Sequence, residues 1–112
     1  MRPKNFSTRF YSDKQEKAIA KAIHGKQQSN SGATKFQKGD VTDEQWLIEA
    51  KTSTTAKASF SIKKEWLDKM KEEAFQMGKY YSSLCFDFGE DTKRYYVVDE
   101  KTFVEMKNSM KG

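Results

Sequence analysis

Residues 39–51 read GDVTDEQWLIEAK and contain two short runs typical of β-strands, DVT and WLIEAK, separated by polar residues. Because strand side chains alternate between faces, Glu49 and Lys51 project from the same face of the second run. If a turn occupies residues 43–46, Asp40 falls opposite Glu49. The sequence therefore predicts a β-hairpin that carries two facing carboxylates and a neighbouring lysine.

The residue types on this hairpin indicate a particular chemistry. Two converging carboxylates repel each other unless a cation lies between them, and their oxygen atoms suit Mg²⁺, with Mn²⁺ as a substitute. A lysine beside such an ion can orient or deprotonate an attacking water and can stabilise charge on a phosphoryl group. We therefore expect Asp40, Glu49 and Lys51 to support metal-dependent phosphodiester hydrolysis. The alternative is that Glu49 and Lys51 form an ordinary pair on an exposed strand.

The residues before the hairpin predict a helix. Ser12 and Asp13 can accept hydrogen bonds from the free amides of a first turn, and Gly25 suits a left-handed stop. Glu16 lies within the apolar stripe of this helix, where an unpaired carboxylate is costly to bury unless a metal or its bound water explains it. The alternative is that Glu16 lies at the edge of the stripe, within reach of solvent. Residues 1–11 show no clear period and are interpreted as an N-terminal arm.

The residues after the hairpin complete the expected domain. A second amphipathic helix is predicted over residues 61–77, with its end at Gly78. Two further strands and a short terminal helix follow, over residues 82–88, 94–98 and 101–108. The order of elements predicts a single domain, residues 1–112, of the α/β class, with a central mixed β-sheet flanked by helices.

The charge of the chain favours polyanions as partners. It has 21 lysines and arginines against 16 acidic residues, a formal net charge of +5. Residues 26–39, KQQSNSGATKFQKG, are polar and basic without a hydrophobic period, which is typical of a loop. This loop suits phosphate contacts. The alternative is a solvated connector.

The single cysteine and the absence of long apolar runs limit the class of protein. Cys85 excludes an intrachain disulfide and a multi-cysteine metal cage, and its apolar neighbours predict a buried core residue in a reducing compartment. No stretch of the sequence is long and apolar enough to span a bilayer. We expect no membrane partner and a cytoplasmic location.

The order of these motifs resembles that of the PD-(D/E)xK nuclease superfamily. KGDV at residues 38–41 is followed by WLIEAKT at residues 46–52, with a helix carrying Glu16 before them and an amphipathic helix after them. Within the superfamily, the pattern resembles that of the Holliday junction resolvases of the archaeal type and their phage relatives, over about residues 12–98. Gly39 stands where the superfamily name places a proline. The resemblance implies a restriction-endonuclease-like fold.

The resemblance also implies roles for single residues. Asp40 and Glu49 would be the acidic ligands of Mg²⁺, the main-chain carbonyl of Ala50 a further ligand, Lys51 the catalytic lysine, and Glu16 the glutamate that holds metal-bound water. The segment around Ser29, Ser31 and Gly32 resembles a mobile loop that reaches the DNA backbone. Candidate DNA contacts in the loop are Ser29, Ser31, Gly32, Lys35 and Lys38.

Three functions are compatible with this pattern. The first is a homodimeric resolvase that cuts branched DNA at four-way junctions, in a bacterial cytoplasm or in that of a phage host. Its interface is expected at Tyr95, Tyr96, Val97, Val98 and Phe103, unless these residues complete the core of the monomer. The second is a related nuclease acting on nicks, flaps or duplex DNA. The third is a non-catalytic nucleic-acid-binding module that uses basic residues and exposed aromatic residues such as Phe36 and Tyr80.

Overall fold

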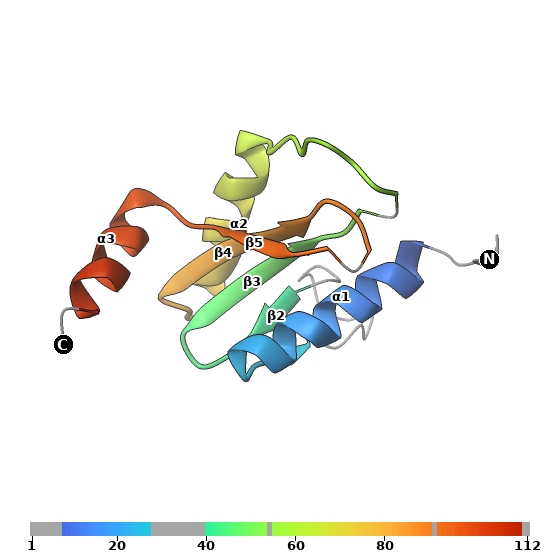
Figure 1. The fold of residues 1–112 in the computed structure, drawn as a ribbon. Coiled ribbons are helices and arrows are strands. Elements are labelled where there is room, and N and C mark those ends of the chain that lie inside the picture. Colours follow the sequence, from blue (N-terminus) through green and yellow to red (C-terminus); the bar gives the residue numbers. More distant parts are fainter. Residues whose placement is uncertain (1–7, 28–39, 54, 91, 111–112) are drawn as a thin grey trace.

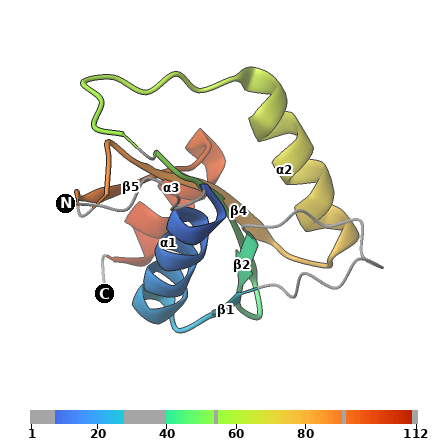
Figure 2. The same ribbon diagram turned by 90° about the vertical axis from the view of Figure 1, so that its right-hand side faces the viewer.

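The computed structural model describes residues 8–27, 40–53, 55–90 and 92–110, and for residues 8–10 and 40 the backbone alone. Figure 1 and Figure 2 show the elements, with β1 labelled in Figure 2: α1 (Thr8–Ile23), β1 (Lys26–Gln27), β2 (Asp40–Thr42), β3 (Trp46–Lys51), α2 (Lys64–Gln76), β4 (Tyr81–Asp87), β5 (Arg94–Val97) and α3 (Glu100–Ser109). The strands form one sheet in the order β1-β2-β3-β4-β5. β3 and β4 are parallel, and the other neighbours are antiparallel. The expected α/β class with a mixed sheet flanked by helices is confirmed.

Both faces of β3 are buried beneath helices. Leu47 is buried beneath α2, and Ile48 is buried on the opposite face beneath α1. Figure 2 shows these two helices on opposite sides of the sheet. One core consists of Leu47, Met70, Ala74 and Leu84, and the other of Ile19, Val41, Ile48 and Cys85. Because a shift by one residue would exchange the two faces, this packing specifies which side chains of β3 point toward each helix.

The β2–β3 hairpin has the predicted register. Asp40 lies opposite Glu49 in the backbone pairing of the two strands. The side chain of Asp43 accepts hydrogen bonds from the amides of Gln45 (2.8 Å) and Trp46 (2.7 Å), which closes the turn. The predicted turn length therefore places the two acidic positions on facing strands.

The ends of α1 differ from the prediction. The helix begins at Thr8, so Ser12 and Asp13 lie inside it and the predicted N-cap is wrong. The side chain of Asp13 instead accepts a hydrogen bond from Gln27 (3.0 Å). Part of the expected N-terminal arm is therefore helical, and residues 1–7 lie outside the described residues.

The C-terminal stop of α1 is also corrected. The residue with a left-handed backbone is His24, with φ 59°, and not Gly25. Gly25 is needed for a different reason, because a Cβ atom there would lie 2.5 Å from the carbonyl oxygen of Thr42. At the end of α2 the prediction is confirmed, since Gly78 has φ +73°.

The remaining core and the last helix follow the sequence pattern. Cys85 is buried, as expected, and burial raises the pKa of its thiol to about 11. α3 begins after Asp99, whose carboxylate accepts hydrogen bonds from the Lys71 ammonium and from the amide of Thr102. These bonds hold the pKa of Asp99 well below its usual range. The Asp99 carboxylate thus caps α3 and attaches the start of this helix to α2.

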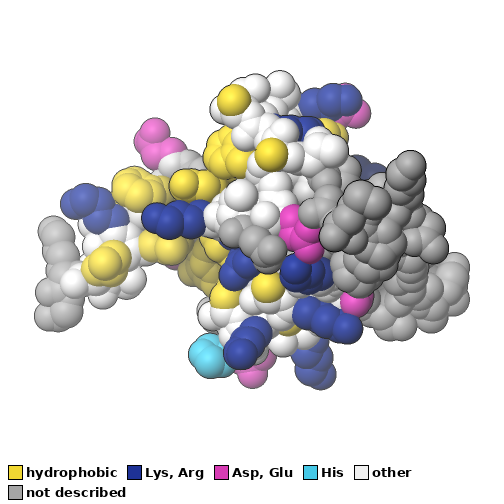
Figure 3. Space-filling model, turned by 45° about the vertical axis from the view of Figure 1, so that its right-hand side comes forward, with side chains coloured by type: hydrophobic (Ala, Val, Ile, Leu, Met, Phe, Trp, Pro, Cys, Tyr) yellow, Lys and Arg dark blue, Asp and Glu magenta, His cyan; other side chains and the backbone are white. Residues whose placement is uncertain are grey.

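α3 and β5 leave a large apolar surface uncovered. Tyr95, Tyr96 and Phe103 are 47%, 41% and 54% exposed, so these side chains do not complete the core of the monomer. Val97 packs against the core beneath α2. Figure 3 shows hydrophobic side chains gathered where α3 projects from the body, at the left of the view. No helix among the described residues is long and apolar enough to cross a membrane.

The two residues at the end of α1 provide a test of this local structure. We expect Gly25→Ala to lower the free energy of unfolding by about 1–3 kcal/mol, because the added methyl group meets a backbone carbonyl. His24→Gly should raise it by up to about 1 kcal/mol, because glycine adopts the left-handed backbone without strain. Urea denaturation followed by circular dichroism measures both. A loss of stability in His24→Gly would show that the left-handed stop lies elsewhere.

Candidate functional site

Glu49 and Lys51 form an ion pair at the C-terminal end of β3. The alternation that directs Leu47 beneath α2 directs these two side chains to the same face. The Lys51 ammonium lies 3.0 Å from Oε2 of Glu49, and the two side chains are 28% and 10% exposed. The pair is therefore largely enclosed, which separates it from the exposed pairs that contribute little to stability.

Lys51 is held by contacts on three sides. Besides Glu49, its ammonium lies over the ring of Trp66 in α2, 4.2 Å from the ring centroid. Its carbonyl oxygen accepts a hydrogen bond from the Gln15 side chain of α1 (2.9 Å). A cation between a carboxylate and an aromatic face has a restricted position, which suits a side chain that must be aimed at a reacting group.

Gln15 belongs to a buried polar network that supports the end of β3. It donates to the carboxylate of Asp87 in β4 (3.2 Å) and accepts from the hydroxyl of Thr52 (2.6 Å). Asp87 also accepts from the amide of Gly89 (3.1 Å). Burial raises the pKa of Asp87. Sequence reasoning did not select Gln15, because a glutamine on a helix carries no signal until its partners from other elements are known.

The strand pairing of the backbone defines where Asp40 and Ala50 lie. Asp40 lies opposite Glu49, and its side chain is outside the described part of the chain. Within the described residues β2 pairs with β3 only as far as Glu49, so Ala50 and Lys51 pair with β4 alone. The main chain of β3 thus extends past β2 next to the two acidic positions, as a carbonyl ligand at Ala50 requires.

A further buried carboxylate, Glu73 of α2, lies near this pair and was missed in the sequence. It is 7% exposed, and burial raises the pKa of its carboxyl. The charge of Glu49 raises this pKa further, whereas Lys69 and Lys51 lower it. The signal was present in the spacing, because residue 73 follows Trp66 by seven positions and so lies on the apolar stripe of the helix.

Glu49 and Glu73 each keep one buried oxygen without a hydrogen bond. Among the described residues, Oε1 of Glu49 and Oε1 of Glu73 have no partner. Buried polar atoms are paired in the great majority of cases, and unsatisfied carboxylate oxygens are among the costliest exceptions. The two carboxylates also interact electrostatically, so this end of β3 is a place where the described part of the fold accepts an energetic cost.

Glu16 is buried on the other side of the sheet. Its carboxylate accepts a hydrogen bond from Gln27 of β1 (3.1 Å) and is 8% exposed. α1 covers the face that contains Val41 and Ile48, whereas Glu49 points toward α2. The described structure therefore does not bring Glu16 to the Glu49 carboxylate, and its role in holding metal-bound water stays a prediction.

The residues predicted to contact DNA belong to the segment between β1 and β2. Ser29, Ser31, Gly32, Lys35 and Lys38 all lie outside the described residues. Among the described residues there is no group of three His, Cys, Asp or Glu side chains that could hold a metal ion. The side chain of Asp40 is not among these described residues.

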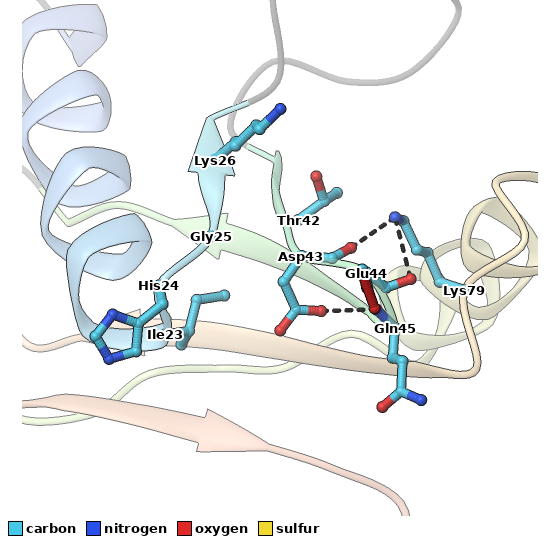
Figure 4. A pocket seen from close by; sticks show the side chains of 9 residues that line it. All are labelled: Ile23, His24, Gly25, Lys26, Thr42, Asp43, Glu44, Gln45 and Lys79. Atoms are coloured by element: carbon cyan, nitrogen blue, oxygen red, sulfur yellow. Dashed lines mark hydrogen bonds between the residues drawn. The ribbon is translucent and has the colours of Figure 1, made fainter.

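A cavity of about 640 Å³ lies at the opposite end of the hairpin from Glu49. Figure 4 shows its lining, in which Lys79 points at the β2–β3 turn. The Lys79 ammonium donates to the carbonyl oxygens of Asp43 (2.6 Å) and Glu44 (3.5 Å). This lysine is thus engaged by the main chain, and its contacts stabilise the turn that sets the register of Asp40 and Glu49.

Comparison of the chain with models of protein families, with curated proteins and with solved structures found no significant match. The chemistry of the candidate site must therefore be judged from its own side chains. These are two buried carboxylates with unsatisfied oxygens, an enclosed lysine and a third acidic position on the facing strand.

Proposed function

We propose that this protein is a metal-dependent, structure-selective DNA endonuclease with a restriction-endonuclease-like fold, and that it cleaves four-way junctions as a Holliday junction resolvase. The observation that carries the proposal is the buried Glu49 carboxylate. One of its oxygens is paired with Lys51 and the other has no partner among the described residues, while Asp40 lies opposite on β2. A nucleic-acid-binding module has no use for buried carboxylates, which repel phosphate and are costly to desolvate.

The donor set fits a magnesium or manganese ion. Hard divalent cations prefer carboxylate and carbonyl oxygens, and the unsatisfied oxygen of Glu49 is available to one. The proposed ligands are Asp40, Glu49 and the main-chain carbonyl of Ala50. When bound, such an ion polarises a phosphoryl oxygen and lowers the pKa of a bound water.

Lys51 supplies the positive charge that the protein itself places beside the proposed metal site. Its position between Glu49 and the Trp66 ring leaves the ammonium next to the carboxylate that would bind the ion. From there it can orient an attacking water or stabilise the charge that develops on the phosphoryl oxygens. Because both contacts come from packed elements, the ammonium is positioned before substrate arrives.

The charge distribution supports DNA as the substrate. The chain carries a formal net charge of +5, and Lys17 and Lys21 are exposed on α1. Figure 3 shows Lys and Arg side chains gathered over the lower part of the molecule, where α1 lies. Binding through such residues releases counterions, so affinity should fall with salt, with a log-log slope of about −0.9 for each phosphate neutralised.

The cleavage assay compares a synthetic four-way junction with nicked, flapped and linear duplexes of the same sequence. We expect Mg²⁺-dependent cleavage that favours the junction. Asp40→Asn and Glu49→Gln should reduce it to background while junction binding, measured by fluorescence anisotropy with Ca²⁺, is retained, because these carboxylates serve the metal and not the duplex. Glu44→Gln, at an exposed carboxylate of the same hairpin, is the matched control. Near-normal cleavage by Glu49→Gln would refute the proposed site, and preference for another substrate would refute the resolvase assignment.

Lys51→Met should lower single-turnover cleavage of the preferred DNA by roughly 10²- to 10⁴-fold, the range for a positioned proton-transfer or electrostatic group. Lys63 is a control because it also lies over the Trp66 ring, 5.7 Å from its centroid, on the exposed side of the helix start. Lys63→Met should cleave at close to the wild-type rate. If Lys51→Met lowered the cleavage rate by less than about threefold, the Glu49–Lys51 pair would be a structural contact only.

Resolution of a junction requires two cuts related by a dyad, so we propose a two-fold homodimer. The apolar surface on β5 and α3 supports this assembly. Exposed side chains there are Tyr96, Phe103, Val104, Met106 and Met110, whereas Tyr95 lies on the opposite face of β5, stacked on Phe86. Beside them lies a hollow of about 260 Å³, whose apolar lining includes Ile48, Tyr96 and Met106. A second copy of the chain would cover a surface of this kind.

The assembly is tested by light scattering at micromolar concentration. We expect a dimer for the wild type and a monomer for Phe103→Glu, because a charge at the centre of an apolar interface must be desolvated. The monomer should nick junctions without making paired cuts. Ile62→Glu, at a partly exposed residue ahead of α2, should remain dimeric. Paired cuts made by a monomeric protein would exclude the dimer.

A further inference from the structure

The strongest unexplained feature is Glu73, which no expectation from the sequence included. The buried side chains of α2 are those of Met70, Glu73 and Ala74, so Glu73 is the one buried acidic residue of this helix. Helix positions of this kind normally carry apolar residues, because an ionised carboxylate buried without a partner costs several kcal/mol or shifts its pKa. An acidic residue there calls for a positive group that offsets the cost.

The described side chains supply too little positive charge for this purpose. The Lys51 ammonium is 3.0 Å from Oε2 of Glu49, which leaves Oε1 of Glu49 and Oε1 of Glu73 without hydrogen bonds among the described residues. Lys69 is exposed on α2 and acts on Glu73 only through its charge. Around the two carboxylates there is thus one enclosed ammonium. A third acidic residue, Asp40, lies opposite Glu49 in the backbone pairing of β2 and β3.

The two orphaned oxygens come from different elements. Glu49 projects from β3 toward α2, and Glu73 projects from the buried face of α2 toward the sheet. They influence each other electrostatically, and each of the two residues is 7% exposed. A divalent cation satisfies converging carboxylates, because it replaces their mutual repulsion by attraction and accepts oxygen ligands from separate chain segments.

We propose that Glu73 is an additional metal-binding carboxylate of this site, which with Glu49 holds a divalent cation between β3 and α2. This inference rests on the proposed function and adds a ligand to the proposed set of Asp40, Glu49 and the carbonyl of Ala50. It also assigns α2 a role beyond covering the sheet, since the helix would contribute a ligand from outside the β2–β3 hairpin. Phosphate is excluded as the occupant of this place, because the groups that face it are predominantly acidic.

The test measures Mn²⁺ binding to the full chain without DNA, from the loss of the free-ion electron paramagnetic resonance signal. We expect Glu73→Gln to raise the Kd for Mn²⁺ by about tenfold or more, the range for a lost ligand or its immediate support. Glu72→Gln removes the same charge from the exposed face of the same helix and should leave Kd within about twofold of the wild type. The Mg²⁺ concentration for half-maximal cleavage should shift in parallel with Kd.

Glutamine has nearly the same shape as glutamate. The melting temperature of the Glu73→Gln variant, measured in the presence of a chelator, verifies that it folds. Glu73→Met, which removes the polar atoms altogether, is the second variant and should give the same loss of Mn²⁺ binding. An unchanged Kd in Glu73→Gln and Glu73→Met, with binding lost in Glu49→Gln, would overturn this inference and leave the proposed function intact. Absence of Mn²⁺ binding and of cleavage in the wild type would overturn both.

Discussion

The burial of both faces of β3 is the constraint on which the rest of the structure depends. A strand covered by α2 on one face and α1 on the other cannot slip by one residue without placing Leu47 and Ile48 against the wrong helices. Full burial of side chains of this size is worth about 1.5–3 kcal/mol each, so several such contacts decide the register. The facing of Asp40 and Glu49 is a consequence of this apolar packing and of the turn at Asp43.

The same pleat that buries Leu47 directs Glu49 and Lys51 toward α2, so the strand passes from core to candidate site within two residues. The site therefore lies on a rigid element and not on a loop. Its cost is visible in the unsatisfied oxygens of Glu49 and Glu73. Functional sites commonly retain groups that reduce stability in the absence of their ligand, and this end of the sheet has that character.

Residues from elements distant in the sequence support the site. Gln15 of α1 ties the main chain of Lys51 to Asp87 of β4, and Trp66 of α2 covers the Lys51 ammonium. The end of β3 is thus held on both faces of the sheet. A lysine restrained in this way would lose little further freedom on acting on a substrate, which the proposed catalytic role of Lys51 requires.

The sequence by itself determined the elements whose patterns are local: the strand alternation of WLIEAK, the hairpin register set by a short turn, and the left-handed Gly78 after α2. Periodicity and turn chemistry are properties of neighbouring residues, so they can be read without the fold. Only the tertiary structure decided that Glu73 lies within electrostatic range of Glu49, that Gln15 holds the end of β3, and that Gly25 is required by the carbonyl of Thr42. These contacts join segments brought together by packing, and the cost of an unpaired carboxylate or a close backbone approach exists only once the partner is in place.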